Sequence, residues 1–309
     1  MTAVRVFAVA LALALFLAAC NDDDGSAPTD PATATPAATA SPGTTAAPSD
    51  EPGAEVDLTT LPIGDAISSA PQAGAVWACQ TTFGGGGASA TGDWINEDGT
   101  YDFTAKPLVD GEVSWPSEFE IVTEGDARSI TGNGLPDHVT GEYPISQDDD
   151  AYDFDRNPNS ISSQDFQFTL PRSPDIAAAA SCVSMGAIGV MLTGSVFFNA
   201  LDATGRDAVA YEIQDSCGGH PEMAGTYHYH GLTSCIADAR NGGHSTPLGY
   251  AFDGFGLYGY YGEDGTIVTN ADLGECHGHA HVLDGEPDVF HYHATWEYPY
   301  TIGCSRGSP

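Results

Sequence analysis

One pattern of cysteine, histidine and aromatic residues occurs twice in the second half of the chain. The first copy is Cys217-Gly218-Gly219-His220, Tyr227-His228-Tyr229-His230 and Cys235; the second is Cys276-His277-Gly278-His279, Phe290-His291-Tyr292-His293 and Cys304. In an extended strand, successive side chains point to opposite faces, so each His-x-His pair puts two imidazoles on one face and the aromatic rings on the other. The repeat therefore predicts two half-buried strands with the same alternation.

The histidines of the repeats are candidates for metal ligands, because neutral imidazole binds zinc, copper, iron and nickel. We predict a transition-metal site that takes zinc or copper. The predicted ligands are His228, His230, His291, His293, His220, His279 and His138. Three histidines in each repeat could build two similar sites or one composite site, and the sequence does not choose between them. His244 follows Gly242-Gly243 in an expected loop and is interpreted as a surface histidine.

The first 56 residues predict export and attachment to a membrane. An apolar run from Val6 to Leu17, too short for a comfortable membrane span, leads into Leu17-Ala18-Ala19-Cys20, which resembles a bacterial lipobox. This resemblance implies cleavage before Cys20 and lipidation of its thiol; an ordinary signal peptide is the alternative. The lipid would anchor the protein to the outer face of the cell membrane, in the periplasm or at the cell surface. Residues 21–56 are rich in Ala, Thr, Pro and Asp and predict a disordered tether.

The charge of the chain excludes one class of partner. The formal net charge is −35, and Lys106 is the single lysine. A nucleic-acid-binding protein needs basic side chains to neutralise phosphates, so nucleic acid is not expected to be a partner. The identity of a protein partner or substrate does not follow from the composition.

Six cysteines follow Cys20, and an even number in an exported chain favours disulfides over thiolate ligands. Fifteen pairings are possible for six cysteines. The symmetry of the repeats suggests Cys217–Cys235 and Cys276–Cys304, which leaves Cys79–Cys182. The alternative is a zinc site with both cysteine and histidine ligands.

Residues 57–309 are expected to form a single mainly β domain, similar to a β-sandwich, with few short helices. Glycine and proline are frequent, and short apolar pieces such as 166–170 and 194–198 are separated by turn residues. Only 177–189 is a candidate for a helix or a buried strand. Whether 57–130 forms a separate subdomain is left open.

Motifs spread over about 130–305 resemble the YHYH-domain family of exported and cell-surface bacterial proteins, which is named for the tetrapeptide at 227–230. Besides the two repeats, these motifs are Gly132-Asn133-Gly134-Leu135-Pro136-Asp137-His138, Arg156-Asn157-Pro158-Asn159-Ser160-Ile161 with Gln164, Gly189-Val190 with Gly194-Ser195-Val196, Leu248-Gly249-Tyr250-Ala251-Phe252-Asp253-Gly254-Phe255 with Tyr258-Gly259, and Pro299-Tyr300. The resemblance implies an exported domain and carries over no activity. This chain departs from the pattern at Phe290 and Ser195, and His277 and His281 enrich the second histidine group.

Two acidic features outside the repeats are weaker candidates. Asp253 precedes Gly254 at a turn; it is interpreted as a turn cap, with a catalytic base or a carboxylate that orients a metal-bound histidine as the alternative. The carboxylates of an acidic loop at 148–155 could bind calcium, although a solvated loop is the better interpretation. The glycine run at 84–87 lacks the residues of a phosphate-binding loop.

Three functions are consistent with these features. The first is a membrane-anchored, extracytoplasmic lipoprotein that binds zinc or copper. The second is a metal-dependent enzyme, a hydrolase or an oxidase, that uses a three-histidine site. The third is a structural or adhesive domain in which the histidines and tyrosines form a hydrogen-bonded network without metal. Whether the protein is an enzyme does not follow from the sequence.

Overall fold

The computed structural model describes residues 56–239, 243–283 and 285–308, which belong to one compact unit. The predictions for the signal segment, Cys20 and most of the tether fall on residues 1–55, which lie outside the described residues. Strands predominate, and the described helices are the single-turn η1 (Asp150–Asp153) and α1 (Ala208–Tyr211). The prediction of a mainly β fold with few short helices is confirmed. No helix in the described ranges is both long and apolar enough to cross a membrane.

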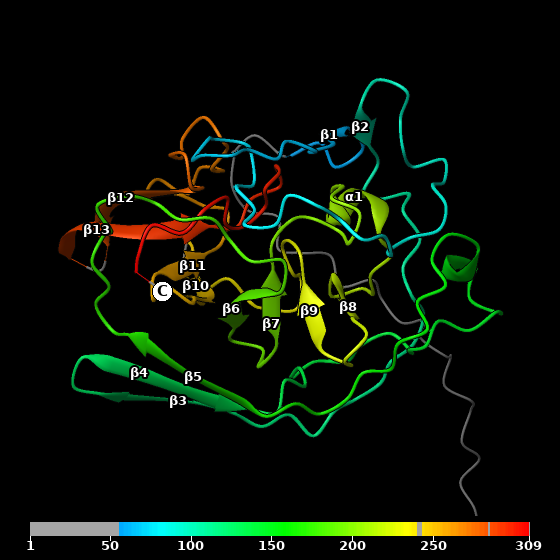
Figure 1. The fold of residues 1–309 in the computed structure, drawn as a ribbon, viewed down its shortest axis with the longest axis horizontal. Helices are drawn as coiled ribbons and strands as arrows, with labels where there is room; N and C mark the ends of the chain where they lie inside the picture. Colours follow the sequence, from blue (N-terminus) through cyan, green and yellow to red (C-terminus); the bar gives the residue numbers. More distant parts are fainter. Residues whose placement is uncertain (1–55, 240–242, 284, 309) are drawn as a thin grey trace, which may run out of the picture. The chain divides into compact units, whose positions relative to one another are not determined.

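The largest element of the fold is an eight-stranded sheet in the order β12-β13-β11-β10-β6-β7-β9-β8. Its strands are β6 (Ala187–Met191), β7 (Val196–Phe198), β8 (Gly219–Pro221), β9 (Tyr227–Tyr229), β10 (Pro247–Ala251), β11 (Gly256–Tyr258), β12 (Gly278–Leu283) and β13 (Glu286–His293). In Figure 1 they extend from β12 and β13 on the left to β9 and β8 on the right. The region 177–189 contributes the start of β6 and no helix.

The sheet consists of two halves with the same connectivity, joined where β6 pairs with β10. In each half an antiparallel hairpin comes first (β6–β7 or β10–β11), and its second strand pairs in parallel with the His-x-His strand (β9 or β13). That strand also pairs with the strand of the Cys-x-x-His segment (β8 or β12). Gly194 and Gly254 occupy equivalent turns, each with φ of 93°, a conformation that glycine adopts without steric cost. The repeated sequence pattern therefore marks a repeated four-strand unit.

A second, three-stranded sheet is made by β3 (Phe119–Glu124), β4 (Ala127–Gly132) and β5 (Phe166–Pro171). Ile130 and Leu170 of this sheet pack with Val190 of β6, and Tyr250 of β10 lies against the same cluster. Figure 1 shows this sheet beside the central strands of the larger one. The two sheets thus pack face to face over part of their area, as the prediction of a β-sandwich-like domain requires.

The described residues before 130 are tied to the repeats. The two-stranded sheet of β1 (Leu61–Pro62) and β2 (Thr100–Tyr101) lies in this segment. The Trp77 amide donates to Gly303 O at 2.8 Å, and the Trp94 ring nitrogen donates to Ala210 O at 2.9 Å. Three disulfides join Cys79 to Cys182, Cys217 to Cys235 and Cys276 to Cys304, which is the pairing that the symmetry of the repeats suggested. Each His-x-His strand therefore lies inside a loop closed by a disulfide.

Candidate metal centres

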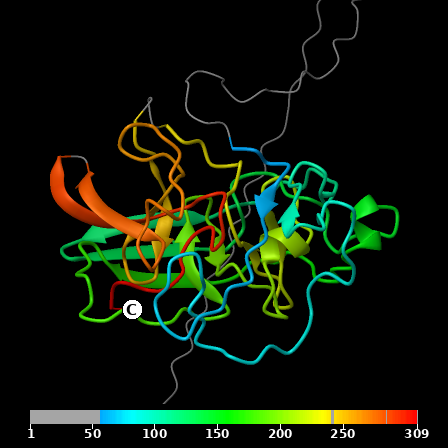
Figure 2. The ribbon, with the colours of Figure 1, turned by 90° about the horizontal axis from the view of Figure 1, so that it is seen from above.

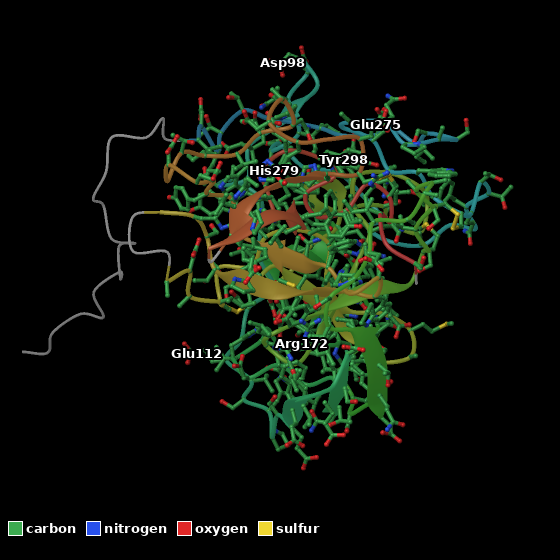
Figure 3. All side chains as sticks on the ribbon, turned by 90° about the vertical axis from the view of Figure 1, so that its left-hand side faces the viewer. Asp98, Glu112, Arg172, Glu275, His279 and Tyr298 are labelled. Carbon is green, nitrogen blue, oxygen red and sulfur yellow. A yellow bond between two sulfur atoms is a disulfide. The ribbon has the colours of Figure 1, made fainter. Side chains whose placement is uncertain are left out.

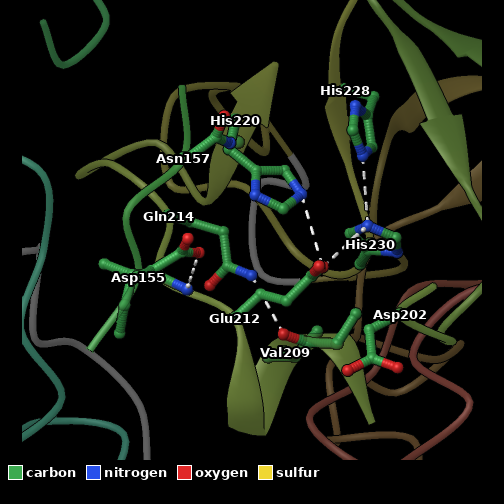
Figure 4. Close-up of polar contacts among 12 residues, drawn as sticks. Asp155, Asn157, Asp202, Val209, Glu212, Gln214, His220, His228 and His230 are labelled. Atoms are coloured by element: carbon green, nitrogen blue, oxygen red, sulfur yellow. Dashed lines mark hydrogen bonds and ion pairs between the residues drawn. The ribbon is translucent and has the colours of Figure 1, made fainter. Parts of the chain in front are cut away.

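Site 1 consists of His220, His228 and His230, whose ring nitrogens lie within 4.8 Å of one another. His220 on β8 is paired in register with His228 on β9, and His230 follows β9 on the same face as His228. All three side chains are buried. Figure 4 shows the three rings converging on one point. The strand alternation of the repeat and the β8–β9 pairing are sufficient to bring these three residues together.

Backbone carbonyls fix the tautomer of two of these histidines. His228 Nδ1 is 3.1 Å from Thr226 O, and His230 Nδ1 is 2.6 Å from Asn199 O. A carbonyl oxygen can only accept, so each Nδ1 carries the proton and each Nε2 carries a lone pair. These two Nε2 atoms are 3.1 Å apart. Two lone pairs at that distance repel each other, and a cation between them would turn the repulsion into coordination.

Glu212, at the C-terminal end of α1, completes the surroundings of site 1. Its Oε2 atom is 3.5 Å from both His220 Nε2 and His230 Nε2, as the dashed lines in Figure 4 show. Burial raises the pKa of this carboxyl to about 8, and the nearby Asp202 and Asp155 add to the effect. Sequence reasoning did not identify Glu212, because it belongs to no motif and reaches the site only through the fold.

The single lysine of the chain lies buried near Glu212. Lys106 Nζ donates hydrogen bonds to Val209 O and to Gln214 Oε1. Burial lowers the pKa of Lys106 to about 7, while Asp207, Glu212 and Asp155 attract its charged form. The side chain thus lies against α1 through its hydrogen bond to Val209 O.

A cavity of about 760 Å³ borders site 1 and is lined by His220, His228, His230 and Glu212. This volume lies within the range of pockets that hold small molecules. The glycine run at 84–87 and Met223, which is 90% exposed, also belong to the lining. A second cavity of about 250 Å³ lies beside the Cys79–Cys182 disulfide and contains no histidine.

Site 2 gathers five histidines at the other end of the sheet: His244, His279, His281, His291 and His293. His291 and His293 of β13 are buried, and the other three are partly exposed. Figure 2 shows the β12–β13 hairpin as two orange arrows, and Figure 3 labels His279 on it. The nearest contacts are at 3.1 Å and join Nε2 atoms of three pairs: His291–His293, His279–His293 and His244–His291.

The same tautomer is fixed throughout site 2. Every Nδ1 atom lies 2.5–3.3 Å from a backbone carbonyl oxygen, those of Ser245, Asp272, Val282, Val289 and Gly259. All five Nε2 atoms therefore carry lone pairs, and four of them face one another at 3.1 Å. A carbonyl behind the ring is also the usual partner of a metal-bound histidine, since it fixes the ring and makes it a better ligand.

The histidines of the two repeats form two separate groups and not one composite site. The two His-x-His strands are not neighbours, because β7, β6, β10 and β11 lie between β9 and β13. At the usual spacing of neighbouring strands the two strands are about 24 Å apart along the sheet. His230 and His293 nevertheless have equivalent partners: the carbonyls of Asn199 and Gly259, each one residue beyond the central hairpin of its half.

Asp253 lies on the tyrosine side of its strand. Its carboxylate accepts hydrogen bonds from Tyr292 Oη at 2.6 Å, Ser305 Oγ at 2.8 Å and the Gly307 amide at 2.9 Å. In the first half, Thr193 holds the equivalent position and contacts Tyr229 Oη at 2.9 Å. The structure thus shows Asp253 as a cap that fixes a tyrosine and the C-terminal turn, and none of its described hydrogen bonds goes to a histidine.

Phe290 stands where the first repeat has Tyr227, and the residues around it differ as well. The hydroxyl of Tyr227 donates to the Asp215 carboxylate, whose oxygens both lie at 2.9 Å. Asp215 and Gly274 occupy equivalent places, since each carbonyl accepts from the residue after the repeat cysteine. The second half therefore lacks both the hydroxyl and its carboxylate acceptor, which removes two polar groups that would otherwise need each other when buried.

Three other histidines have positions that the sequence did not settle. His138 lies apart from site 1, with Nε2 at 2.6 Å from Tyr229 Oη and Nδ1 at 2.8 Å from Val139 O. Its nearest potential metal partners, Cys217 and Cys235, are joined in a disulfide. His277 is buried against Thr295 and belongs to neither site. His244, interpreted from the sequence as a surface histidine, is partly exposed, but its ring also belongs to site 2, with Nε2 at 3.1 Å from His291 Nε2.

The acidic loop has structural tasks in the described chain. Asp149 Oδ1 caps η1 by accepting from the Ala151 amide at 2.8 Å, and its Oδ2 accepts from the Asp110 amide at 3.0 Å. Asp155 is buried, and its Oδ2 accepts from the Ile213 amide at 3.4 Å. These contacts support the interpretation as a loop over the calcium alternative.

The buried histidines predict that the metal-free protein loses stability in mild acid. Burial is the main cause that lowers the pKa values of His220, His228, His230, His277, His291 and His293, with that of His230 at about 4 and that of His291 at about 3. The unfolded chain takes up these protons near pH 6.5, so the stability that these histidines provide is complete above that pH and is lost as the pH falls toward the folded pKa values.

Buried carboxyls partly oppose this loss. Burial raises the pKa values of Asp155, Asp207, Glu212 and Asp215, so the folded chain keeps these protons when the unfolded chain has released them. The six lowered histidines outnumber the four raised carboxyls, so the unfolded chain binds more protons, and each proton of this excess corresponds to about 1.4 kcal/mol per pH unit. Urea unfolding of the chelator-treated protein between about pH 5 and 6.5 should show this slope. A midpoint that does not change over this range would contradict it.

Comparison with known proteins adds one match. A model of the YHYH protein family matches residues 167–267, a range that contains all of site 1 together with His244 and ends before β12. The wider resemblance over about 130–305 is thus supported over this shorter range. Neither the curated proteins nor the solved structures include a significant match. Residues 167–267 of this chain are thus similar to the YHYH protein family.

Proposed function

We propose that this protein binds transition-metal ions in the extracytoplasmic space, one ion at each of its two histidine sites. The observation that carries the proposal is the contact between unprotonated Nε2 atoms at 3.1 Å in both sites, with each Nδ1 proton held by a backbone carbonyl. Buried polar atoms normally face a hydrogen-bond partner. Acceptors that face each other in this way therefore support a cation bound between them.

The ligands favour zinc or copper(II). Site 2 offers only imidazole nitrogen, and site 1 offers three imidazoles, a donor set that suits zinc, copper and nickel. The three disulfides and the family match agree with an extracytoplasmic location, where cysteines are oxidised and leave histidine as the main ligand for such metals. Attachment to the membrane through a lipid on Cys20 is part of the proposal and is supported by the lipobox-like Leu17-Ala18-Ala19-Cys20.

Metal content by elemental mass spectrometry tests the proposal. The disulfide-intact protein, loaded with zinc and desalted, should hold about two equivalents. His228→Ala/His230→Ala should remove only the equivalent at site 1, and His291→Ala/His293→Ala only the one at site 2. His138→Ala is the matched control, because this histidine lies outside both sites, and it should keep both equivalents. A folded parent that takes up no metal would overturn the proposal.

A metal-dependent enzyme is the second candidate, and one observation favours it for site 1 alone. The large cavity ends on the three histidines and Glu212, so a molecule in the cavity would contact a bound ion directly.

A further inference from the structure

We infer that Glu212 is the fourth protein ligand of site 1, and that the metal there keeps a coordination position open to the cavity for a small, uncharged molecule with an oxygen donor. This inference rests on the proposed function, because it requires a metal at site 1. It makes the two sites chemically different: site 1 has three nitrogens and one oxygen, and site 2 has nitrogens only.

Two distances around Glu212 are those between ligands of a common ion. Metal–ligand bonds of 2.0–2.1 Å in a five-coordinate geometry, with four protein ligands and one open position, place neighbouring ligand atoms about 2.9–3.6 Å apart. Glu212 Oε2 lies 3.5 Å from the Nε2 atoms of His220 and His230, and the Nε2 atoms of His228 and His230 are 3.1 Å apart. The ligand atoms that all lie within 4.8 Å of one another are those of the three histidines without Glu212, so the Glu212 carboxylate has to shift toward His228 before all four atoms can bind one ion.

No hydrogen bond in the described structure accounts for the burial of the Glu212 carboxylate. The residue is 6% exposed, and its Oε2 atom has no hydrogen-bond partner. A protonated carboxyl could donate to an imidazole, but 3.5 Å is too long for that bond. The ring nitrogens of His220 have no well-formed hydrogen bond either. Carboxylate and imidazole atoms left without partners in a buried site are expected to coordinate a cation.

Among the described residues, the equivalent region of site 2 has no such buried carboxylate. Glu263 lies beside His281, but its side chain is 56% exposed, and its contact at 3.4 Å is with Nδ1, the nitrogen that faces a carbonyl. Coordination by oxygen is therefore a property of site 1. Because oxygen ligands favour harder ions, the two sites should differ in their relative affinity for cobalt or zinc against copper.

The lining of the cavity decides what could occupy the open position. Four carboxylates face it, those of Asp155, Asp202, Glu212 and Glu222, against the single guanidinium of Arg156. Arg206 is paired with Asp202 at 2.8 Å, so the remaining excess of two negative charges balances one divalent ion, and an anion such as a phosphate ester would gain no net attraction. A neutral carbonyl or hydroxyl compound leaves this balance unchanged and could donate its oxygen to the metal.

Cobalt(II) is the probe for the test, because its visible spectrum reports the ligands. Protein with site 2 removed by His291→Ala/His293→Ala should bind one equivalent. Adding Glu212→Gln should weaken cobalt binding by at least ~10-fold in competition with a chelator, since the anionic ligand is lost. Glu222→Gln is the matched control: this side chain lines the same cavity but caps its own turn, and its loss should leave the affinity unchanged.

Titration with neutral acetohydroxamic acid tests the open position. The cobalt spectrum of the site 1 protein should change with saturation, whereas a protein that retains only site 2 should not respond. Equal cobalt affinity for Glu212→Gln and its parent, both folded by circular dichroism, would overturn the role of Glu212. If Glu212→Gln fails to fold, Glu212→Asp carries the same expectation of weaker binding. A spectrum that does not respond to acetohydroxamic acid would show a closed site, and a parent that binds no cobalt would overturn the proposed function as well.

Discussion

Zinc loading is expected to raise the melting temperature of the disulfide-intact protein by about 10–20 °C over the chelator-treated protein. An ion held at 100 times its dissociation constant stabilises the folded state by about 2.7 kcal/mol, and two sites double this gain. For a domain of this size, 1 kcal/mol corresponds to about 2–4 °C. The physical source is the replacement of repulsion between Nε2 lone pairs by coordination at both sites.

Differential scanning calorimetry with and without chelator measures this shift. His228→Ala/His230→Ala and His291→Ala/His293→Ala should each retain about half of it, because the sites lie at separate ends of the sheet and contribute independently. A melting temperature that chelators leave unchanged would instead favour the structural alternative, in which the rings form a network without metal.

Asp253→Ala is expected to destabilise the protein by about 3–5 kcal/mol while both metal sites keep their ions. The substitution leaves the hydroxyls of Tyr292 and Ser305 and the amide of Gly307 without their buried acceptor. It does not touch a metal ligand, since the carboxylate lies on the tyrosine side of the sheet. Chemical unfolding and zinc content, measured on the same samples, separate the two effects.

Thr193→Ala is the matched control in the other half. Tyr229 would lose the contact with Thr193 but keep its bond with His138 Nε2 at 2.6 Å, so the expected cost is only about 1 kcal/mol. If Asp253→Ala instead removed metal at unchanged stability, the alternative of a carboxylate that orients a metal-bound histidine would return.

The repeated sequence pattern predicted the local structure of each half better than the arrangement of the two halves. The period of two in His-x-His is a property of one strand, so it correctly placed His228 with His230, and His291 with His293, on common faces. The offset from cysteine likewise identified His220 and His279, because each lies on the strand that pairs with its own His-x-His strand. Strand pairing within a disulfide-closed loop is short-range and leaves few alternatives.

The two site residues that the sequence did not predict lie outside the strands that carry the other histidines. Glu212 enters site 1 from the end of α1, and His244 enters site 2 from the loop before β10. Nothing in their local sequence distinguishes them from a solvent-exposed glutamate or a loop histidine. His138 is the opposite case: the sequence predicted it as a ligand, but its ring lies outside both sites.

The sequence by itself determined the β character, the duplicated histidine faces and the symmetry behind the disulfide pairing, because each follows from the spacing of residues along one strand or loop. Only the tertiary structure decided that there are two sites and that they differ. The parallel pairing of β9 with β7 and of β13 with β11 puts the histidine hairpins at opposite ends of one sheet. Contacts between strands distant in the chain set that order, and residue spacing carries no information about them.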